Sequence, residues 1–95
     1  MSMKYEFMCI IKPFLPEDVR IKLQNSIKKI FIDHKGKISN EDIWGKRHLA
    51  YPISSHEEGY YVVYNIDIPA NQVNEAKAEL KLLSDILRFL FVKKD

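Results

Sequence analysis

Apolar side chains alternate with period two near the start of the chain. Residues 4–13 (KYEFMCIIKP) are rich in aromatic and β-branched side chains and end at a proline, which predicts a strand. Successive side chains of a strand point to opposite faces of the sheet. One face carries Tyr5, Phe7, Cys9 and Ile11, and the other carries Glu6, Met8 and Ile10. We expect the first face to lie against the core.

The spacing becomes helical after Pro16. Proline suits the first position of a helix, and Glu17 and Asp18 suit the positive end of its dipole. Leu15 would then be the N-cap, and it is a poor cap because its side chain has no oxygen. The apolar stripe that follows contains Val19, Leu23, Ile27 and Ile30, with Phe31 beside it. We expect Gly36 to take the left-handed conformation that ends this helix.

Two long extended segments follow, residues 37–53 and residues 56–69. Both are rich in residues that favour strands, and the second ends at a proline. We expect them to form an antiparallel hairpin, entered through Ser54, Ser55 and a loop that ends at Gly59.

A second helix and a last strand complete the pattern. Asn71 can cap the helix, and its apolar stripe is Val73, Ala76, Leu80 and Leu83. Residues 85–94 (DILRFLFVKK) read as a strand. The order of elements predicts an α+β protein of the ferredoxin-like βαββαβ type, with a four-stranded antiparallel sheet and two helices on one face. We expect residues 1–95 to form this single domain.

Composition narrows the possible functions only a little. A chain of 95 residues is long enough for one domain. A net charge of +2 permits a nucleic-acid partner without requiring one. The single cysteine excludes an internal disulfide and a thiolate metal cage, and fits a reducing compartment. The charged start gives no sign of a secretory signal, and the apolar runs are too short to cross a membrane.

Few side chains suggest catalysis. His34, His48 and His56 fall in a helix end, a strand and a loop, without metal-ligand spacing, so we expect solvated histidines. The sequence has no glycine-rich phosphate loop and no nucleophile elbow. Cys9 lies on the inward face of its strand, where a small core thiol is the simpler interpretation. We therefore expect no enzymatic activity, no cofactor, no small-molecule substrate and no bound metal.

RNA binding through a standard recognition motif also finds weak support. That motif places a basic residue, a glycine and alternating aromatic residues on the third strand. Residues 58–65 (EGYYVVYN) supply Gly59, Tyr60 and Val63 in register but fail at most other positions. The tyrosines of this strand are at least as well explained by packing within the sheet.

The basic cluster Lys46, Arg47 and His48 is a sharper candidate. Arginine pairs bidentately with phosphate, and lysine adds a point charge. Neighbouring strand residues point to opposite faces, so at least one of the three points away from the core. Charges also keep edge strands soluble, and spacing alone does not separate the two interpretations.

The cluster lies within a longer segment that identifies a family. Residues 45–54 closely resemble the signature of the bacterial small-subunit ribosomal protein number six family, which runs glycine, any residue, basic, polar, leucine, small, tyrosine, any residue, isoleucine, polar or basic. The matching residues are Gly45, Lys46, Arg47, His48, Leu49, Ala50, Tyr51, Pro52, Ile53 and Ser54. Trp44, the Tyr-Glu pair of the first strand, the Gly-Tyr-Tyr start of the third and the Leu-Arg pair of the last also resemble the family.

This resemblance implies a non-enzymatic protein of the cytoplasmic ribosome. Family members bind the central domain of 16S ribosomal RNA together with small-subunit protein number eighteen during assembly. On this basis we expect RNA or partner contacts from Lys46, Arg47, His48, Arg88, Lys93 and Lys94. The helix of this chain opens on a Leu-Pro pair where the family usually has a capping residue. The sequence ends at Asp95, so functions of the long charged tail found in some members are not carried over.

The resemblance also suggests a role for the apolar residues of the signature. We expect Leu49, Tyr51 and Ile53 to fix the register of their strand, because a slip by one residue would move all three to the other face.

The alternative to the ribosomal interpretation is a small dimeric ferredoxin-like enzyme or regulatory domain with no role in RNA binding.

Overall fold

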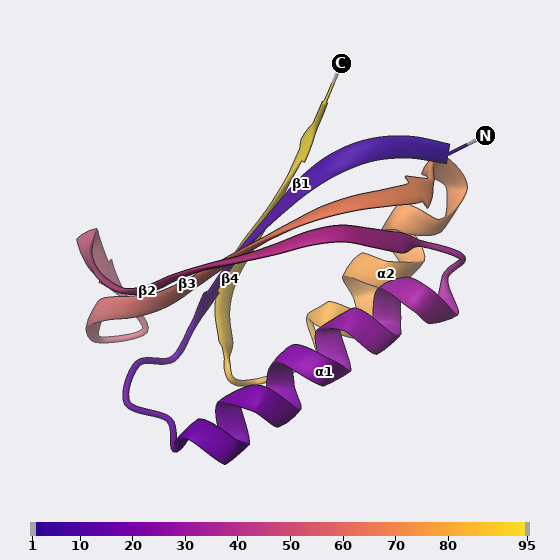
Figure 1. Ribbon diagram of the computed structural model, residues 1–95. Helices are drawn as coiled ribbons and strands as arrows, with labels where there is room; N and C mark the ends of the chain where they lie inside the picture. Colours follow the sequence, from indigo (N-terminus) through magenta and orange to yellow (C-terminus); the bar gives the residue numbers. More distant parts are fainter. Residues whose placement is uncertain (1, 95) are drawn as a thin grey trace.

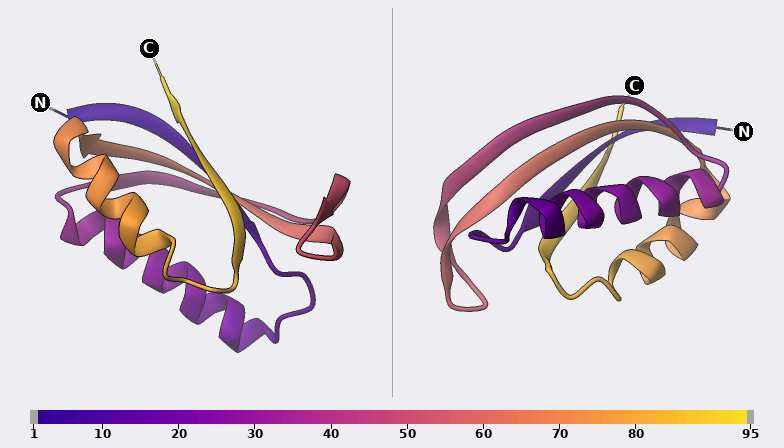
Figure 2. Two further views of the ribbon diagram at one scale, coloured as in Figure 1. Left: turned by 180° about the vertical axis from the view of Figure 1, so that it is seen from behind. Right: turned by 60° about the horizontal axis from the view of Figure 1, so that its bottom comes forward.

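The computed structural model describes residues 2–94, which form one sheet and two helices (Figure 1). The strands are β1 (Ser2–Ile11), β2 (Lys37–Ile53), β3 (His56–Pro69) and β4 (Ile86–Lys93), and the helices are α1 (Glu17–Asp33) and α2 (Val73–Leu80). The strand order is β2-β3-β1-β4, and all neighbours are antiparallel. Both helices lie on one face of the sheet (Figures 1 and 2). The predicted ferredoxin-like fold is confirmed.

Alternation along β1 separates the core from the other side of the sheet. Phe7, Cys9 and Ile11 are fully buried beneath the helices. The Phe7 ring contacts the Phe31 ring of α1 at a centroid distance of 5.0 Å. The predicted inward face of this strand is confirmed. We call the sheet face opposite the helices the open face.

The two ends of α1 differ from the sequence prediction. Pro16, not Leu15, is the N-cap, and no side chain caps the first turn. Leu15 instead packs against the core, because its side chain is apolar. Of the predicted stripe, Val19 remains 37% exposed, whereas the others are buried, namely Leu23, Ile27, Ile30 and Phe31.

The left-handed residue that ends α1 is Lys35, with φ 66°, and not Gly36. Lys35 N–H donates to the Ile32 carbonyl and Gly36 N–H donates to the Phe31 carbonyl, at 3.1 and 2.7 Å, the pattern of a Schellman motif. A Cβ on residue 36 would lie 2.8 Å from that Phe31 oxygen. The glycine is therefore required by close backbone approach and not by its φ angle.

The start of α2 also differs from the prediction. A 3₁₀ turn, Ala70–Gln72, precedes the helix, and neither this turn nor α2 has a side-chain cap. Asn71 lies inside the turn and does not cap the helix. The predicted stripe is buried at Val73, Ala76 and Leu80, and Leu83 packs at its edge after the helix has ended.

The hairpin between β2 and β3 turns at Ser54 and Ser55. Both residues have positive φ angles, 49° and 67°, and Ile53 pairs directly with His56. A two-residue connection with two positive φ angles is the tight hairpin geometry whose twist matches the flanking strands. Gly59 therefore lies inside β3 and does not end a loop. A Cβ there would lie 2.4 Å from Cγ2 of Ile10, so glycine lets the strands pack closely.

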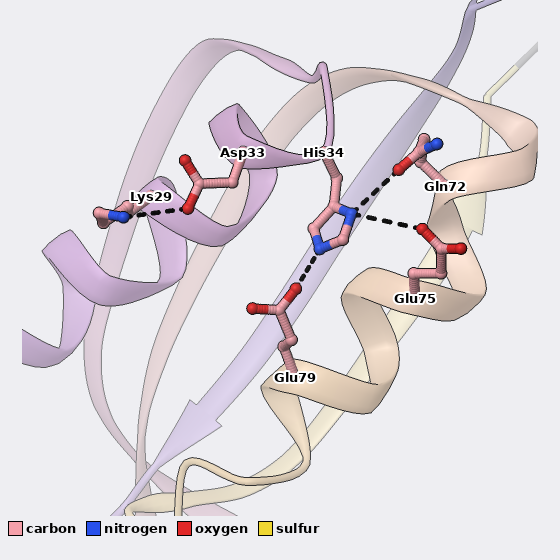
Figure 3. A network of polar contacts seen from close by, with 6 residues as sticks. All are labelled: Lys29, Asp33, His34, Gln72, Glu75 and Glu79. Atoms are coloured by element: carbon pink, nitrogen blue, oxygen red, sulfur yellow. Dashed lines mark hydrogen bonds and ion pairs between the residues drawn. The ribbon is translucent and has the colours of Figure 1, made fainter.

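His34 joins the two helices. Its Nδ1 lies 3.0 Å from Oε1 of Gln72, and its Nε2 contacts the Glu79 carboxylate. An oxygen of the Glu75 carboxylate lies 3.8 Å from Nδ1 (Figure 3). Its side chain is only 15% exposed, so the expectation of a solvated histidine is wrong for His34. It holds for His48, which is exposed, whereas His56 is half-buried at the start of β3 rather than in a loop.

Candidate nucleic-acid and partner interface

A β-bulge at Gly45 directly precedes the basic cluster in β2. Two residues of β2, Trp44 and Gly45, lie across from a single step of β3, between Val62 and Tyr61. Gly45 has a φ of 81°, and a Cβ there would meet no atom within 4 Å. Its glycine is therefore needed for backbone conformation and not for space. The bulge lets Trp44 stack on Tyr61, with rings 11° from parallel and 6.2 Å between centroids.

The three basic residues are all exposed and point to both faces of the sheet. Lys46 pairs with Tyr60, Arg47 with Gly59 and His48 with Glu58. Directly opposed residues of an antiparallel pair share a face, so Lys46 points to the helix side with Tyr60, and Arg47 points to the open face. Glu41 pairs with Lys28 at 3.3 Å and not with Arg47. Among residues 2–94, Arg47 forms no ion pair.

Two cations on the helix side lie over aromatic rings. Lys46 Nζ is 4.3 Å from the centre of the Phe14 ring. Arg20 Cζ, from α1, is 4.4 Å from the centre of the Tyr60 ring. Tyr60 is the cross-strand partner of Lys46. The two contacts therefore link the β1–α1 connection and α1 to β2 and β3 on the helix side of the sheet.

The tip of the hairpin reaches across to the far edge strand. Residues 49–52 of β2 lie opposite only Glu57 of β3, so the strand bulges outward here. Tyr51 is 58% exposed, and its hydroxyl accepts a hydrogen bond from Arg88 of β4 at 2.5 Å. The role of Tyr51 in fixing the strand register stays a prediction, and its side chain lies at the surface. Only Leu49 and Ile53 are half-buried.

The predicted binding residues in β4 and just after it divide between the two ends of the sheet. Arg88 is opposite Ile10 in β1, whereas Lys93 is opposite Tyr5. That separation is roughly 17 Å along the strand. Lys94 donates to the Asn65 side chain at 2.9 Å. The structure therefore brings Arg88 to the hairpin end and leaves Lys93 and Lys94 at the other.

Part of the open face is apolar and accessible to solvent. Trp44, Leu90 and Val92 are 40%, 56% and 46% exposed. Met8 and Ile10 of β1 lie beside β4, and Trp44 of β2 reaches Ile10 through Tyr61 of β3. A shallow cavity of about 310 Å³ is lined by Met8, Ile10, Arg88, Phe89 and Leu90. We call Met8, Ile10, Trp44, Leu90 and Val92 the open-face patch. Contiguous exposed apolar surface of this kind is typical of a protein interaction site.

The aromatic residues of β3 offer little surface for stacking on this face. Tyr64 is fully buried on the helix side. Tyr60 is half-buried there, and Tyr61 is covered by Trp44. Packing in the sheet, one of the two interpretations left open by the sequence, therefore accounts for all three.

The described residues show no arrangement suited to catalysis. Burial raises the pKa of the Cys9 thiol to about 12, so this buried cysteine is a core residue and not a nucleophile. Within residues 2–94, no three His, Cys, Asp or Glu side chains converge to hold a metal ion. Over the same residues, neither helix is long and apolar enough to cross a membrane.

Sequence reasoning missed three features of this surface. Phe14 is 75% exposed beside Lys46, and a bulky apolar residue in a short Pro-rich connection was its only sequence signal. The β1 and β4 residues of the open-face patch could have been predicted, because they are apolar residues at outward positions of these strands. The contact between Arg88 and Tyr51 joins residues 37 positions apart and left no local signal.

Comparison with known proteins agrees with the signature. The sequence profile of the ribosomal protein S6 family matches residues 4–93. The small ribosomal subunit protein bS6 of Dictyoglomus turgidum is 42% identical over 87 residues, which cover 92% of this chain and 90% of the relative. The bS6 of Caldanaerobacter subterraneus subsp. tengcongensis is 36% identical over 91 residues, 96% of each chain.

A solved structure also superposes on this chain. The 30S ribosomal protein S6 of Thermotoga maritima matches with a TM-score of 0.92 at 30% sequence identity, over 99% of this chain and 89% of that one. Profile, relatives and fold agree along nearly the whole length of the sequence. The chain therefore belongs to the ribosomal protein S6 family, whose members are structural and not enzymatic components of the small ribosomal subunit.

Proposed function

We propose that this protein binds the central domain of 16S ribosomal RNA together with small-subunit protein S18 during assembly of the small subunit. The observation that carries the RNA part is the state of the basic cluster. Lys46, Arg47 and His48 are exposed, and none of them forms an ion pair within residues 2–94. Lys46 and Arg47 are therefore cations that are free to meet phosphate groups.

The open-face patch supports a protein partner. Its side chains would lose their exposure to water on docking, which is favourable by about 25 cal/mol per Å² of apolar surface. Arg47 and Arg88 point to the same face, by their register with Gly59 and Ile10. S18 would therefore cover the apolar strands and meet the RNA beside the hairpin.

The low net charge supports the dependence of one partner on the other. A protein with a net charge of +2 contributes few phosphate contacts by itself. We expect the RNA affinity of this chain to be weak alone and to rise strongly when S18 is present. The basic partner would supply most of the phosphate contacts.

The test is a calorimetric or gel-shift titration of 16S central-domain RNA with this protein alone, with S18 alone and with both. Strong binding only with both proteins is expected. Equally tight binding without S18 would contradict the cooperative proposal. No RNA binding in any combination, together with stable self-association through the open-face patch, would support the rival interpretation of a small dimeric regulator.

A further inference from the structure

Phe14 presents a large apolar ring to solvent in a strained conformation. It is 75% exposed and has a φ of 65°, a region that side chains other than glycine, asparagine and aspartate rarely occupy. Its neighbours are anchored, because Pro13 is buried and Leu15 packs against the core. The ring is therefore held outward by its flanks. Strained residues that the surrounding structure enforces are often functional.

One cation lies over this ring, and a second lies over the ring of Tyr60. Lys46 Nζ lies 4.3 Å from the ring centre, and Arg20 lies over Tyr60, the residue that pairs with Lys46. Neither cation forms an ion pair within residues 2–94. The Arg20 Nε is buried there and has no hydrogen-bond partner. Aromatic surface and unpaired positive charge thus occur side by side.

We propose that Phe14, Arg20 and Lys46 form a subsite for one unpaired nucleotide, with its base stacked on Phe14 and its phosphate held by the two cations. This inference rests on the proposed RNA-binding function. A nucleotide is the ligand class that offers both the flat π-face of a base and a negatively charged phosphate, joined through one sugar. Lys46 lies over one face of the Phe14 ring, and the base would stack on the other face. The two contacts therefore do not compete for the ring.

The alternative occupant is an acidic or aromatic segment of a protein partner. The RNA is favoured because the cluster combines two cations with an aromatic ring and lies next to Arg47 and His48 on β2. The protein alternative is an outcome of the test below.

The experiment compares Phe14→Asn, Phe14→Trp and the control Leu82→Asn in binding to 16S central-domain RNA in the presence of S18. Asparagine tolerates a positive φ, so the melting temperature of Phe14→Asn should not fall. Base stacking on an aromatic side chain predicts a roughly 5–150-fold loss of RNA affinity for Phe14→Asn. Phe14→Trp should retain the affinity, and Leu82→Asn, at an 81% exposed residue, should match wild type.

A second measurement uses the wild-type protein and does not depend on any variant folding. Irradiation of the complex made with RNA that carries 4-thiouridine at unpaired positions should cross-link a peptide that contains Phe14. The inference is overturned if Phe14→Asn binds as wild type and no such cross-link forms, while intact RNA binding would leave the proposed function standing. A loss of binary S18 affinity in Phe14→Asn without RNA would assign the ring to the protein partner instead. Failure of the wild type to bind RNA with S18 would overturn both proposals.

Discussion

Single residues of the signature act through the backbone as much as through their side chains. Gly45 allows the bulge that moves Trp44 onto Tyr61 and sets the direction of the basic residues after it. Ser54 and Ser55 accept positive φ angles without being glycine. The signature therefore encodes the shape of an exposed hairpin as well as a set of charges.

Gly45→Ala should destabilise the protein by about 1–2 kcal/mol, because an alanine pays the left-handed penalty at a φ of 81°. No steric clash adds to this cost, since the space around the Cβ position is empty. Gly45→Asn should cost less, because asparagine tolerates this region. Urea unfolding of the two variants measures the difference, and equal losses would point to a cause other than φ.

Arg47→Ala should weaken the complex with RNA and S18 without changing the fold. If Arg47 meets phosphate, its loss should cost roughly 1–3 kcal/mol of binding and reduce the salt slope by about one contact. The matched control is Lys22→Ala, an exposed cation on α1. A lower denaturant midpoint with unchanged affinity would make Arg47 a structural residue.

At the scale of elements, the two helices are joined to each other by a charged contact as well as through the sheet. Both ring nitrogens of His34 face oxygen acceptors, Gln72 Oε1 and a Glu79 carboxylate oxygen. Only the doubly protonated imidazolium can donate to both. The hydrogen bond to Glu79, followed by that to Gln72, raises the pKa of His34 above 6.5.

This contact predicts a pH dependence of stability. A raised pKa stabilises the folded state fully below the unfolded-state pKa of about 6.5, and this contribution is lost as the pH rises through the folded-state value. The free energy of unfolding should therefore fall as the pH rises from about 6.5 through the raised pKa, and fall less in His34→Gln. Urea titrations at a series of pH values test this, with His48→Gln, an exposed histidine, as the control. Identical slopes in wild type and His34→Gln would refute the contribution.

The hairpin turn is a second element whose sequence is not optimal for its shape. Asn-Gly is the preferred pair where both central residues have positive φ angles. The double variant Ser54→Asn, Ser55→Gly should therefore raise stability by about 1 kcal/mol. Ser55→Val should lower it, because a β-branched residue fits this region worst. Thermal unfolding of the variants measures these changes, and a destabilised Asn-Gly variant would contradict the role of the positive φ angles in this turn.

At the scale of the whole molecule, the sheet separates a helix-covered face from an open one. The helices bury the inward residues of β1 and β3, whereas no helix within residues 2–94 lies on the open face (Figures 1 and 2). The basic hairpin projects from one end of this two-layer body (Figure 1). A protein partner on the open face and RNA at the hairpin would then use neighbouring surfaces.

Leu90→Ser should weaken binding to S18 with little loss of stability. Leu90 is 56% exposed, and burial of a leucine side chain is favourable by roughly 1.5–3 kcal/mol, so a loss of tenfold or more in affinity is expected. Leu82→Ser, in the turn after α2, is the matched control because Leu82 is 81% exposed. Calorimetric titration with S18 in the absence of RNA provides the measurement. Equal affinities of the two variants would remove the open face from the proposed interface.

The sequence by itself determined the order of the elements, the inward face of β1 and the family. These follow from periodicity and from residues close together in the chain, which act through local backbone preferences and through burial of one face. The same local preferences predicted the bounds of β2 and β3. The two strands cover residues 37–53 and 56–69, as expected from the sequence.

Tertiary structure alone decided how the ends of elements close and which surface remains exposed. Lys35 rather than Gly36 takes the left-handed conformation because Gly36 must approach the Phe31 carbonyl. His34 is held by Gln72 of the 3₁₀ turn and Glu79 of α2, 38 and 45 residues further along the chain. Tyr51 is exposed because β2 bulges toward Arg88 on β4. Each of these features depends on residues that are distant in sequence, and local sequence patterns do not predict where those residues lie.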